Sequence, residues 1–120
     1  MEHLVNKSHY DLEDRTLTFA KDVRKLIKQI PKHLENYDDL KQLIRSSGSI
    51  GANYREANEA LSKRDFIMRA KIFRKEAKET VYWLQLLSIE DQALKTVQIA
   101  LIKEATELMK IFGAIITKSE

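Results

Sequence analysis

Cysteine is absent from this 120-residue chain, which excludes disulfides, thiolate metal sites and cysteine nucleophiles. Proline occurs once and glycine three times, so few residues interrupt a helical backbone. No apolar run approaches the ~18–20 residues that a membrane span needs, and the first residues lack the basic end and apolar core of a signal peptide. We therefore expect one soluble, cytoplasmic domain, since this length suits a single hydrophobic core.

Positive charge is concentrated in the middle third of the chain, although the net charge of the whole is only +3. Residues 41–78 carry ten basic and four acidic side chains, a net charge of +6. Residues 1–40 and 79–120 carry net charges of −1 and −2. This distribution indicates an anionic partner for the middle segment.

Hydrophobic periodicity predicts four long helices joined by short loops, which is typical of an all-α fold, an up-and-down antiparallel four-helix bundle. Pro31 ends the first helix, because its ring removes a backbone donor and disfavours helical geometry in the residue before it. Asp38 or Asp39 is expected to cap the second helix, and Ser62, followed by Asp65, the third. The predicted bounds are about 11–30, 38–60, 63–88 and 91–117, after a flexible lead-in at 1–10.

Each helix has one face that we expect to lie in the core, because apolar or small residues recur on it at steps of three and four. These are Leu12, Thr16, Phe19, Ala20, Val23, Leu26, Ile27 and Ile30; then Leu40, Leu43, Ile44, Ser47, Ile50, Gly51, Tyr54, Ala57, Asn58 and Leu61; then Phe66, Ala70, Phe73, Ala77, Thr80, Leu84 and Leu87; and finally Leu94, Val97, Leu101, Ala105, Leu108, Phe112 and Ile115.

The stretch 46–52 consists almost entirely of small residues and would ordinarily be read as a loop. The apolar phase is nevertheless preserved on both sides of it, which predicts an unbroken helix although two interior glycines cost about 2 kcal/mol. Small side chains there would let a neighbouring helix approach closely. The alternative is a helix–turn–helix break at Gly48.

A basic stripe is predicted on the third helix, opposite its core face. At ~100° per residue, Lys71, Lys75 and Lys78 fall within about 40° of the direction of Arg64 around the helix axis. An ordinary solvated face is the alternative interpretation; against it, few acidic residues lie nearby. Contacts to an anionic polymer would be mostly to phosphates of RNA or DNA and sensitive to salt. The candidate contacts are Arg45, Arg55, Arg64, Arg69, Lys71, Arg74, Lys75 and Lys78.

A second apolar set lies off the core face of the third helix, at Met68, Ile72, Trp83 and Leu86. One buried stripe per helix suffices for a bundle, so extra apolar surface that includes a tryptophan indicates a packed interface. The fourth helix has similar extra residues at Ile99, Ile102 and Ile116. We interpret the set as a homo-oligomer interface, with a monomer or a different protein partner as alternatives.

The sequence contains few of the residue patterns that are typical of catalytic or metal sites. The three histidines lie near the N-terminus or in a predicted loop, and the Glu-x-x-His pairs of carboxylate-bridged metal bundles do not occur. Glycine-rich phosphate loops and nucleophile elbows are also missing. We expect no enzyme, no catalytic residue, no metal and no cofactor; a small-molecule or metal-binding bundle is the weakest of the alternatives.

Several segments together resemble the bacterial four-helix-bundle family of 23S rRNA intervening-sequence proteins, also called the S23 family. The resemblance extends from about residue 11 to 117. Many family members have proline where this chain has Gly51, and proline would kink the second helix. The matching residues are Ile30 and Pro31; Leu40, Gln42, Leu43 and Arg45 to Ser47; Ser49 to Tyr54, Glu56 and Ala57; Asp65 and Phe66; and the run from Lys75 to Leu87.

The resemblance implies a four-helix bundle that often assembles as a homopentamer. Some members are encoded inside rRNA intervening sequences, and a related group serves as the accessory protein of the reverse transcriptase of diversity-generating retroelements, with a basic pentameric barrel that binds nucleic acid. Our leading hypothesis is therefore a non-enzymatic homo-oligomeric bundle that binds RNA or DNA through phosphate contacts. A protein-interaction scaffold without direct nucleic-acid binding is the alternative.

Overall fold

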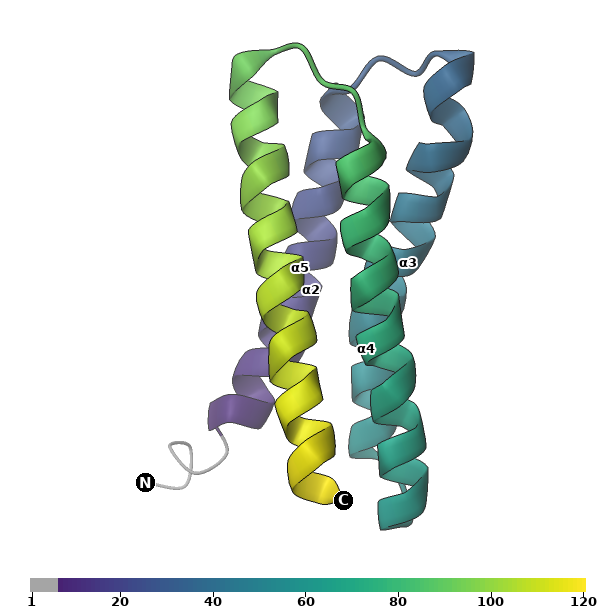
Figure 1. Cartoon of the computed structure of the whole chain (residues 1–120), viewed down its shortest axis with the longest axis vertical. Coiled ribbons are helices and arrows are strands. Elements are labelled where there is room, and N and C mark those ends of the chain that lie inside the picture. The colour runs from purple at the N-terminus through teal and green to yellow at the C-terminus, as the bar shows by residue number, and fades with distance from the viewer. Residues whose placement is uncertain (1–6) are drawn as a thin grey trace.

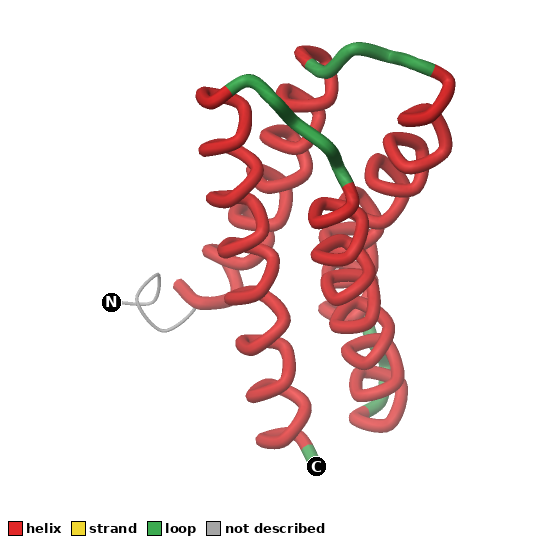
Figure 2. The backbone as a smooth tube through the Cα atoms, turned by 45° about the horizontal axis from the view of Figure 1, so that its top comes forward, coloured by secondary structure: helices red, strands yellow, loops and turns green. Residues whose placement is uncertain are grey.

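A computed structural model describes residues 7–120, and their side chains from residue 12 onward with residue 34 excepted. Four helices run up and down in an antiparallel bundle, so the predicted fold class is confirmed (Figure 1). They are α2 (Lys7–Gln29), α3 (Leu34–Asn58), α4 (Lys63–Leu86) and α5 (Gln92–Ser119). The α2–α3 and α4–α5 loops lie at one end of the bundle and the α3–α4 loop at the other (Figure 2).

Two predicted helix starts were too late. The first helix begins at Lys7, not at Asp11, so residues 7–10 of the predicted flexible lead-in are helical, and residues 1–6 lie outside the described part. The second begins at Leu34, and neither Asp38 nor Asp39 caps it. His33 occupies the cap position without a side-chain bond. The first turn is held instead by Asn36, whose side-chain Nδ2 donates to Pro31 O at 3.2 Å and whose backbone N–H donates to His33 O at 3.0 Å.

The remaining caps follow ordinary side-chain chemistry. Ser62 Oγ accepts the Asp65 N–H at 3.0 Å, as predicted for the start of α4. Asp91 Oδ1 accepts the Leu94 N–H at 3.0 Å at the start of α5. Three predicted helix ends differ by two residues, since α3 ends at 58, α4 at 86 and α5 at 119, and α2 ends at 29, one residue before the prediction.

The core is centred on three aromatic rings from three helices. Phe73 meets Phe112 edge-on at 4.4 Å between centroids, and Tyr54 lies 5.5 Å from Phe73 and 6.3 Å from Phe112. Most residues of the four predicted faces surround this cluster. Four do not follow the prediction: Ile44, Leu61 and Val97 are exposed, and Ile116, assigned to extra surface, is buried. Leu61 is exposed because α3 has already ended. On α5, the buried face includes Gln98 and Ile116 and leaves Val97 outside it.

Helix α3 runs without a break through the small-residue segment, and no glycine has a positive φ. The helix–turn–helix alternative is therefore wrong. A Cβ on Gly51 would lie 3.0 Å from Thr16 Oγ1 and 3.3 Å from Thr16 Cβ on α2. The small residues let α2 and α3 approach closely, as expected.

Candidate nucleic-acid interface

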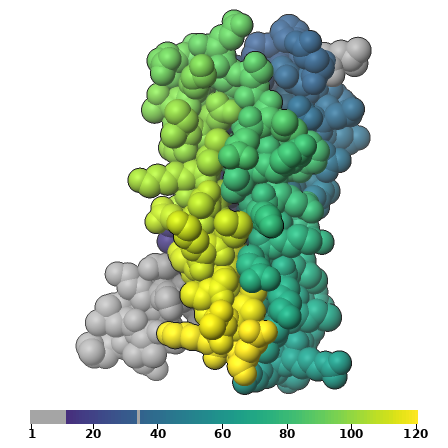
Figure 3. Space-filling model, viewed as in Figure 1, coloured from purple at the N-terminus to yellow at the C-terminus, as the bar shows by residue number. Residues whose placement is uncertain are grey.

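The outer face of α4 carries the predicted basic stripe. Ala70, Phe73, Ala77 and Leu84 are fully buried, and at ~100° per residue the stripe lies on the opposite side of the helix. Arg64, Lys71, Lys75 and Lys78 are all exposed. Figure 3 shows α4 at the surface beside α5, with its length open on this side. The solvent-facing stripe is thus available to a partner.

Two of the eight candidate cations are already engaged in ion pairs. Arg45 crosses from α3 to α4, where Nη2 lies 2.9 Å from Glu79 Oε2 and 3.3 Å from Glu76 Oε1. Its hydrogen bond to Glu76 raises the pKa of the Arg45 guanidinium against an opposing effect of burial, and the charges of both carboxylates add to the increase. Arg69 lies 3.7 Å from Glu56 and 3.8 Å from Asp65. Their charge is largely compensated locally.

The other six candidate cations form no ion pair with any side chain that the structure describes. Three of them form a compact group: Lys71, Lys75 and Lys78 span about 10 Å of one helix face. The remaining three are dispersed: Arg55 in the last turn of α3, Arg64 in the first turn of α4, and Arg74 on the flank of α4 away from Arg69. The strongest anion-binding surface is therefore the three-lysine group.

An open depression of about 600 Å³ adjoins two of these lysines, Lys75 and Lys78, between α3 and α4. Aromatic side chains lie beside cations in it. Tyr82 is 56% exposed, and its ring meets the ring of Trp83 edge-on at 5.1 Å between centroids with an angle of 75°. The depression, which we call the α3–α4 depression, is lined by Gln42, Arg45, Lys75, Lys78, Glu79, Tyr82 and Trp83.

Sequence reasoning missed Tyr82 and Gln42 as parts of this surface. Tyr82 lies 18 residues after Arg64, five full helical turns, so the wheel that defined the stripe also contained it. The missing signal for Gln42 is tertiary, because only the packing of α3 against α4 brings it next to Tyr82 and Trp83.

The predicted oligomer residues do not form one continuous patch. Met68 and Leu86 are exposed, but they lie about 27 Å apart along α4, with the lysines and Tyr82 between them. Ile72 is half-buried, and Trp83 is half-buried against the core. On α5, Ile99 is exposed whereas Ile102 packs on the core. The oligomer interface itself stays a prediction.

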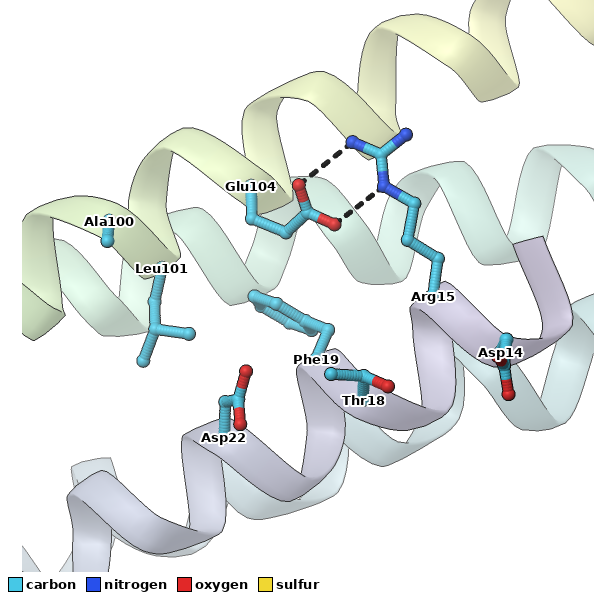
Figure 4. A pocket seen from close by; sticks show the side chains of 8 residues that line it. All are labelled: Asp14, Arg15, Thr18, Phe19, Asp22, Ala100, Leu101 and Glu104. Carbon is cyan, nitrogen blue, oxygen red and sulfur yellow. Dashed lines mark hydrogen bonds and ion pairs between the residues drawn. The ribbon is translucent and has the colours of Figure 1, made fainter. Parts of the chain in front are cut away.

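A second hollow, of about 510 Å³, lies between α2 and α5 and has the opposite electrostatic character. Arg15 reaches from α2 to Glu104 on α5, with Nε and Nη2 donating to the two carboxylate oxygens at 2.8 and 2.9 Å (Figure 4). Asp14 and Asp22 also line it. Three carboxylates against one guanidinium make this hollow unsuitable for phosphate.

The described residues offer little to other chemistries. Among them, no three His, Asp or Glu side chains gather as metal ligands. Their helices also fall short of the length and apolarity that crossing a membrane requires.

These features define the class of the protein: an antiparallel four-helix bundle in which the outer face of α4 carries a lysine-rich, partly aromatic surface. The chain belongs to the family of 23S rRNA-intervening sequence proteins, whose sequence model matches residues 9–114. The resemblance drawn from the sequence is thereby confirmed.

One solved structure similar to this chain is the crystal structure of a protein of unknown function from the S23 ribosomal protein family of Bacteroides thetaiotaomicron VPI-5482. The two are 36% identical, with a TM-score of 0.76, over 88% of this chain and 97% of the other. No curated protein matches the chain.

Proposed function

We propose that this protein is a non-enzymatic, cytoplasmic, homo-oligomeric bundle that binds RNA or DNA through phosphate contacts from the outer face of α4. The observation that carries the proposal is the group of Lys71, Lys75 and Lys78, three exposed cations on one face that lack carboxylate partners among the described residues. Such a group attracts phosphates, because binding releases the counterions that surround them. The family name, which refers to rRNA, is consistent with this.

The test is a filter-binding or anisotropy titration with structured rRNA at several salt concentrations. The logarithm of affinity is expected to fall linearly with the logarithm of salt concentration, with a slope of about −0.9 for each phosphate contact on a duplex. Replacing Lys71, Lys75 and Lys78 together by Gln should reduce the slope by about two to three contacts. Absence of binding at low salt, or affinity indifferent to salt, would sink the proposal.

The matched control replaces three exposed lysines of α5, Lys95, Lys103 and Lys110, by Gln, which removes the same number of positive charges from another helix. Their replacement should alter affinity less than twofold if the α4 face makes the contacts. An equal loss in both variants would point to net charge alone and contradict a localised interface.

Self-association is the second part of the proposal, and the family resemblance implies five copies. Exposed apolar residues on α4, Met68 and Leu86, support it. Trp83→Ala is a poor probe, because Trp83 also packs against the core. Met68→Gln and Leu86→Gln avoid this difficulty. Light scattering should show a monodisperse oligomer that the pair of exposed substitutions weakens; a stable monomer would favour the scaffold alternative with an external protein partner.

A further inference from the structure

The α3–α4 depression differs from the rest of the basic face because it combines an exposed aromatic ring with cations. Tyr82 is more than half exposed, and its edge contact with Trp83 holds the ring from one side only. Trp83 is in turn packed against the core, so the pair has a firm base. An exposed, supported aromatic ring is the platform on which single-stranded nucleic acids stack their bases.

The cations in the depression are arranged for phosphates next to that ring. Lys75, Lys78 and Tyr82 follow one another on one face at steps of three and four residues, about 4.5 and 6 Å along the axis. Glu76 and Glu79 form ion pairs with Arg45 and not with these lysines. The two lysines and Arg45 against the two carboxylates leave a net charge of +1 at the depression. The same pairs hold the Arg45 guanidinium in place at the wall of the depression.

We infer that the α3–α4 depression binds an unpaired nucleotide of a single strand, with the base stacked on Tyr82 and the adjoining phosphates on Lys75 and Lys78. This inference rests on the proposed nucleic-acid binding and specifies its substrate class. A duplex offers only its phosphates to this site, since its bases are already stacked on one another. At about 600 Å³ the depression is within the size range of sites that hold small ligands.

The test compares a single strand of about 12 nucleotides with the duplex formed from it and its complement, each titrated against the full chain. Tyr82→Ala should weaken single-strand binding about tenfold and leave duplex binding within about twofold of the native protein. Tyr82→Phe keeps the ring and should retain native affinity. Because Trp83 is the sole tryptophan, its fluorescence should respond to the single strand in the native protein and respond less in Tyr82→Ala.

Two arms use the same sequence as RNA and as DNA. If Tyr82→Ala loses affinity equally for RNA and DNA, the site recognises the base and phosphate that both share. If it loses affinity for only one of them, the site is supported and that nucleic acid is its ligand. The inference is overturned if Tyr82→Ala leaves single-strand affinity unchanged, if it weakens duplex binding equally, or if it changes the oligomeric state instead, which would make this face a protein interface.

The outcomes also separate this inference from the proposed function. One outcome is that Lys75→Gln and Lys78→Gln weaken binding of the single strand and of the duplex while Tyr82→Ala changes neither. In that case the proposed phosphate binding is supported and the nucleotide site is refuted. If the native protein binds no nucleic acid at low salt, both fail together. Circular dichroism of each variant verifies folding, and Tyr82 is exposed enough that its truncation leaves the core intact.

Discussion

Gly51 of α3 faces Thr16 of α2 so closely that a methyl group on Gly51 would lie 3.0 Å from the Thr16 hydroxyl oxygen. Thr16 is fully buried, and its hydroxyl donates to Leu12 O at 2.7 Å. The neighbour therefore has little room to move. This pair explains why a helix can tolerate a costly glycine: the loss of helix propensity is offset by the close packing of two helices.

We expect Gly51→Ala to lower the free energy of unfolding by about 1 kcal/mol, because overpacking of about 1–3 kcal/mol exceeds a propensity gain of about 1 kcal/mol. Gly113→Ala is the matched control, since nothing lies within 4 Å of its added Cβ, and it should stabilise by about 1 kcal/mol. Urea denaturation at one fixed protein concentration measures both, because assembly makes apparent stability concentration-dependent. Equal stabilisation by the two substitutions would refute the packing argument.

A second prediction concerns Gln98, a buried glutamine that ties α5 to the end of α4. Its Nε2 donates to Leu84 O at 2.7 Å and to Leu87 O at 3.0 Å, two carbonyls at the end of α4, of which Leu84 O also accepts the Leu87 N–H at 3.4 Å. Gln98→Ala should lower the free energy of unfolding by about 2 kcal/mol, since Leu87 O loses its donor and Leu84 O keeps only the longer bond from the Leu87 N–H. Thermal or urea denaturation measures the loss.

Gln98→Glu provides a sharper version of this test. A carboxylate facing two carbonyls cannot donate, so destabilisation at neutral pH should exceed that of Gln98→Ala. Protonation restores one donor, and burial against two carbonyls raises the pKa of this carboxyl, so the deficit should shrink as pH falls through that raised pKa and level off below the unfolded value of about 4.3. Gln92→Glu, on an exposed residue in the first turn of α5, is the control and should be near neutral. A pH-independent deficit in Gln98→Glu would argue against the capping role.

The fold was predictable because helical periodicity is a local property, and the alternation from Phe66 to Leu87 marks the buried seam of α4 without reference to the other helices. On α5, steps of three and four permit either Val97 or Gln98 at the seam. Apolarity favoured Val97, but the carbonyls at the end of α4 recruit Gln98. That choice depends on where another helix ends, which no local pattern contains.

Only the basic stripe on α4 was predictable from the sequence, not the candidate site as a whole. Its lysines come from one helix, so a helical wheel locates them. Which arginines are already paired depends on contacts between helices: Arg45 meets carboxylates 31 and 34 residues away. The assembly of the α3–α4 depression requires the same information. Sequence reasoning therefore overcounted available cations and missed Tyr82 as their neighbour.

A third prediction follows from the ion pair between Arg45 and Glu76. Glu76 is only 7% exposed, so removing its partner leaves a carboxylate largely buried without compensation. Arg45→Gln should lower the free energy of unfolding by about 2 kcal/mol, less than the 3–5 kcal/mol of a fully buried pair because the Arg45 side chain is half exposed. Adding Glu76→Gln should recover part of the loss.

Arg69→Gln is the matched control for this prediction. Its ion pairs are longer, 3.7 and 3.8 Å, and both carboxylates are more exposed than Glu76. Its removal should therefore cost less than about 1 kcal/mol. Should the two arginine variants prove equally stable in urea denaturation, burial of Glu76 would not be the cause of the Arg45 effect.

A fourth prediction concerns alkaline stability and Tyr54 in the centre of the core. Burial raises the pKa of the Tyr54 hydroxyl above its ordinary value of about 10, the bond with Asn58 opposes the increase, and the charge of Glu13 adds to it. The unfolded chain releases this proton at lower pH than the folded protein does. The resulting stability is fully present below pH ~10 and is lost as pH rises through the folded pKa.

Tyr54→Phe should therefore flatten the decline in the free energy of unfolding above pH ~10, whereas Tyr37→Phe, on an exposed ring, should leave the native decline unchanged. Lysine deprotonation is common to all three proteins, so the difference between them isolates the tyrosine. Absorbance titration of the native protein should show a tyrosine ionisation delayed beyond pH ~10, and that step should vanish in Tyr54→Phe. If the free energy of unfolding of Tyr54→Phe declines above pH ~10 as steeply as that of the native protein, other groups cause the alkaline instability. The raised pKa of the Tyr54 hydroxyl would then contribute nothing to it.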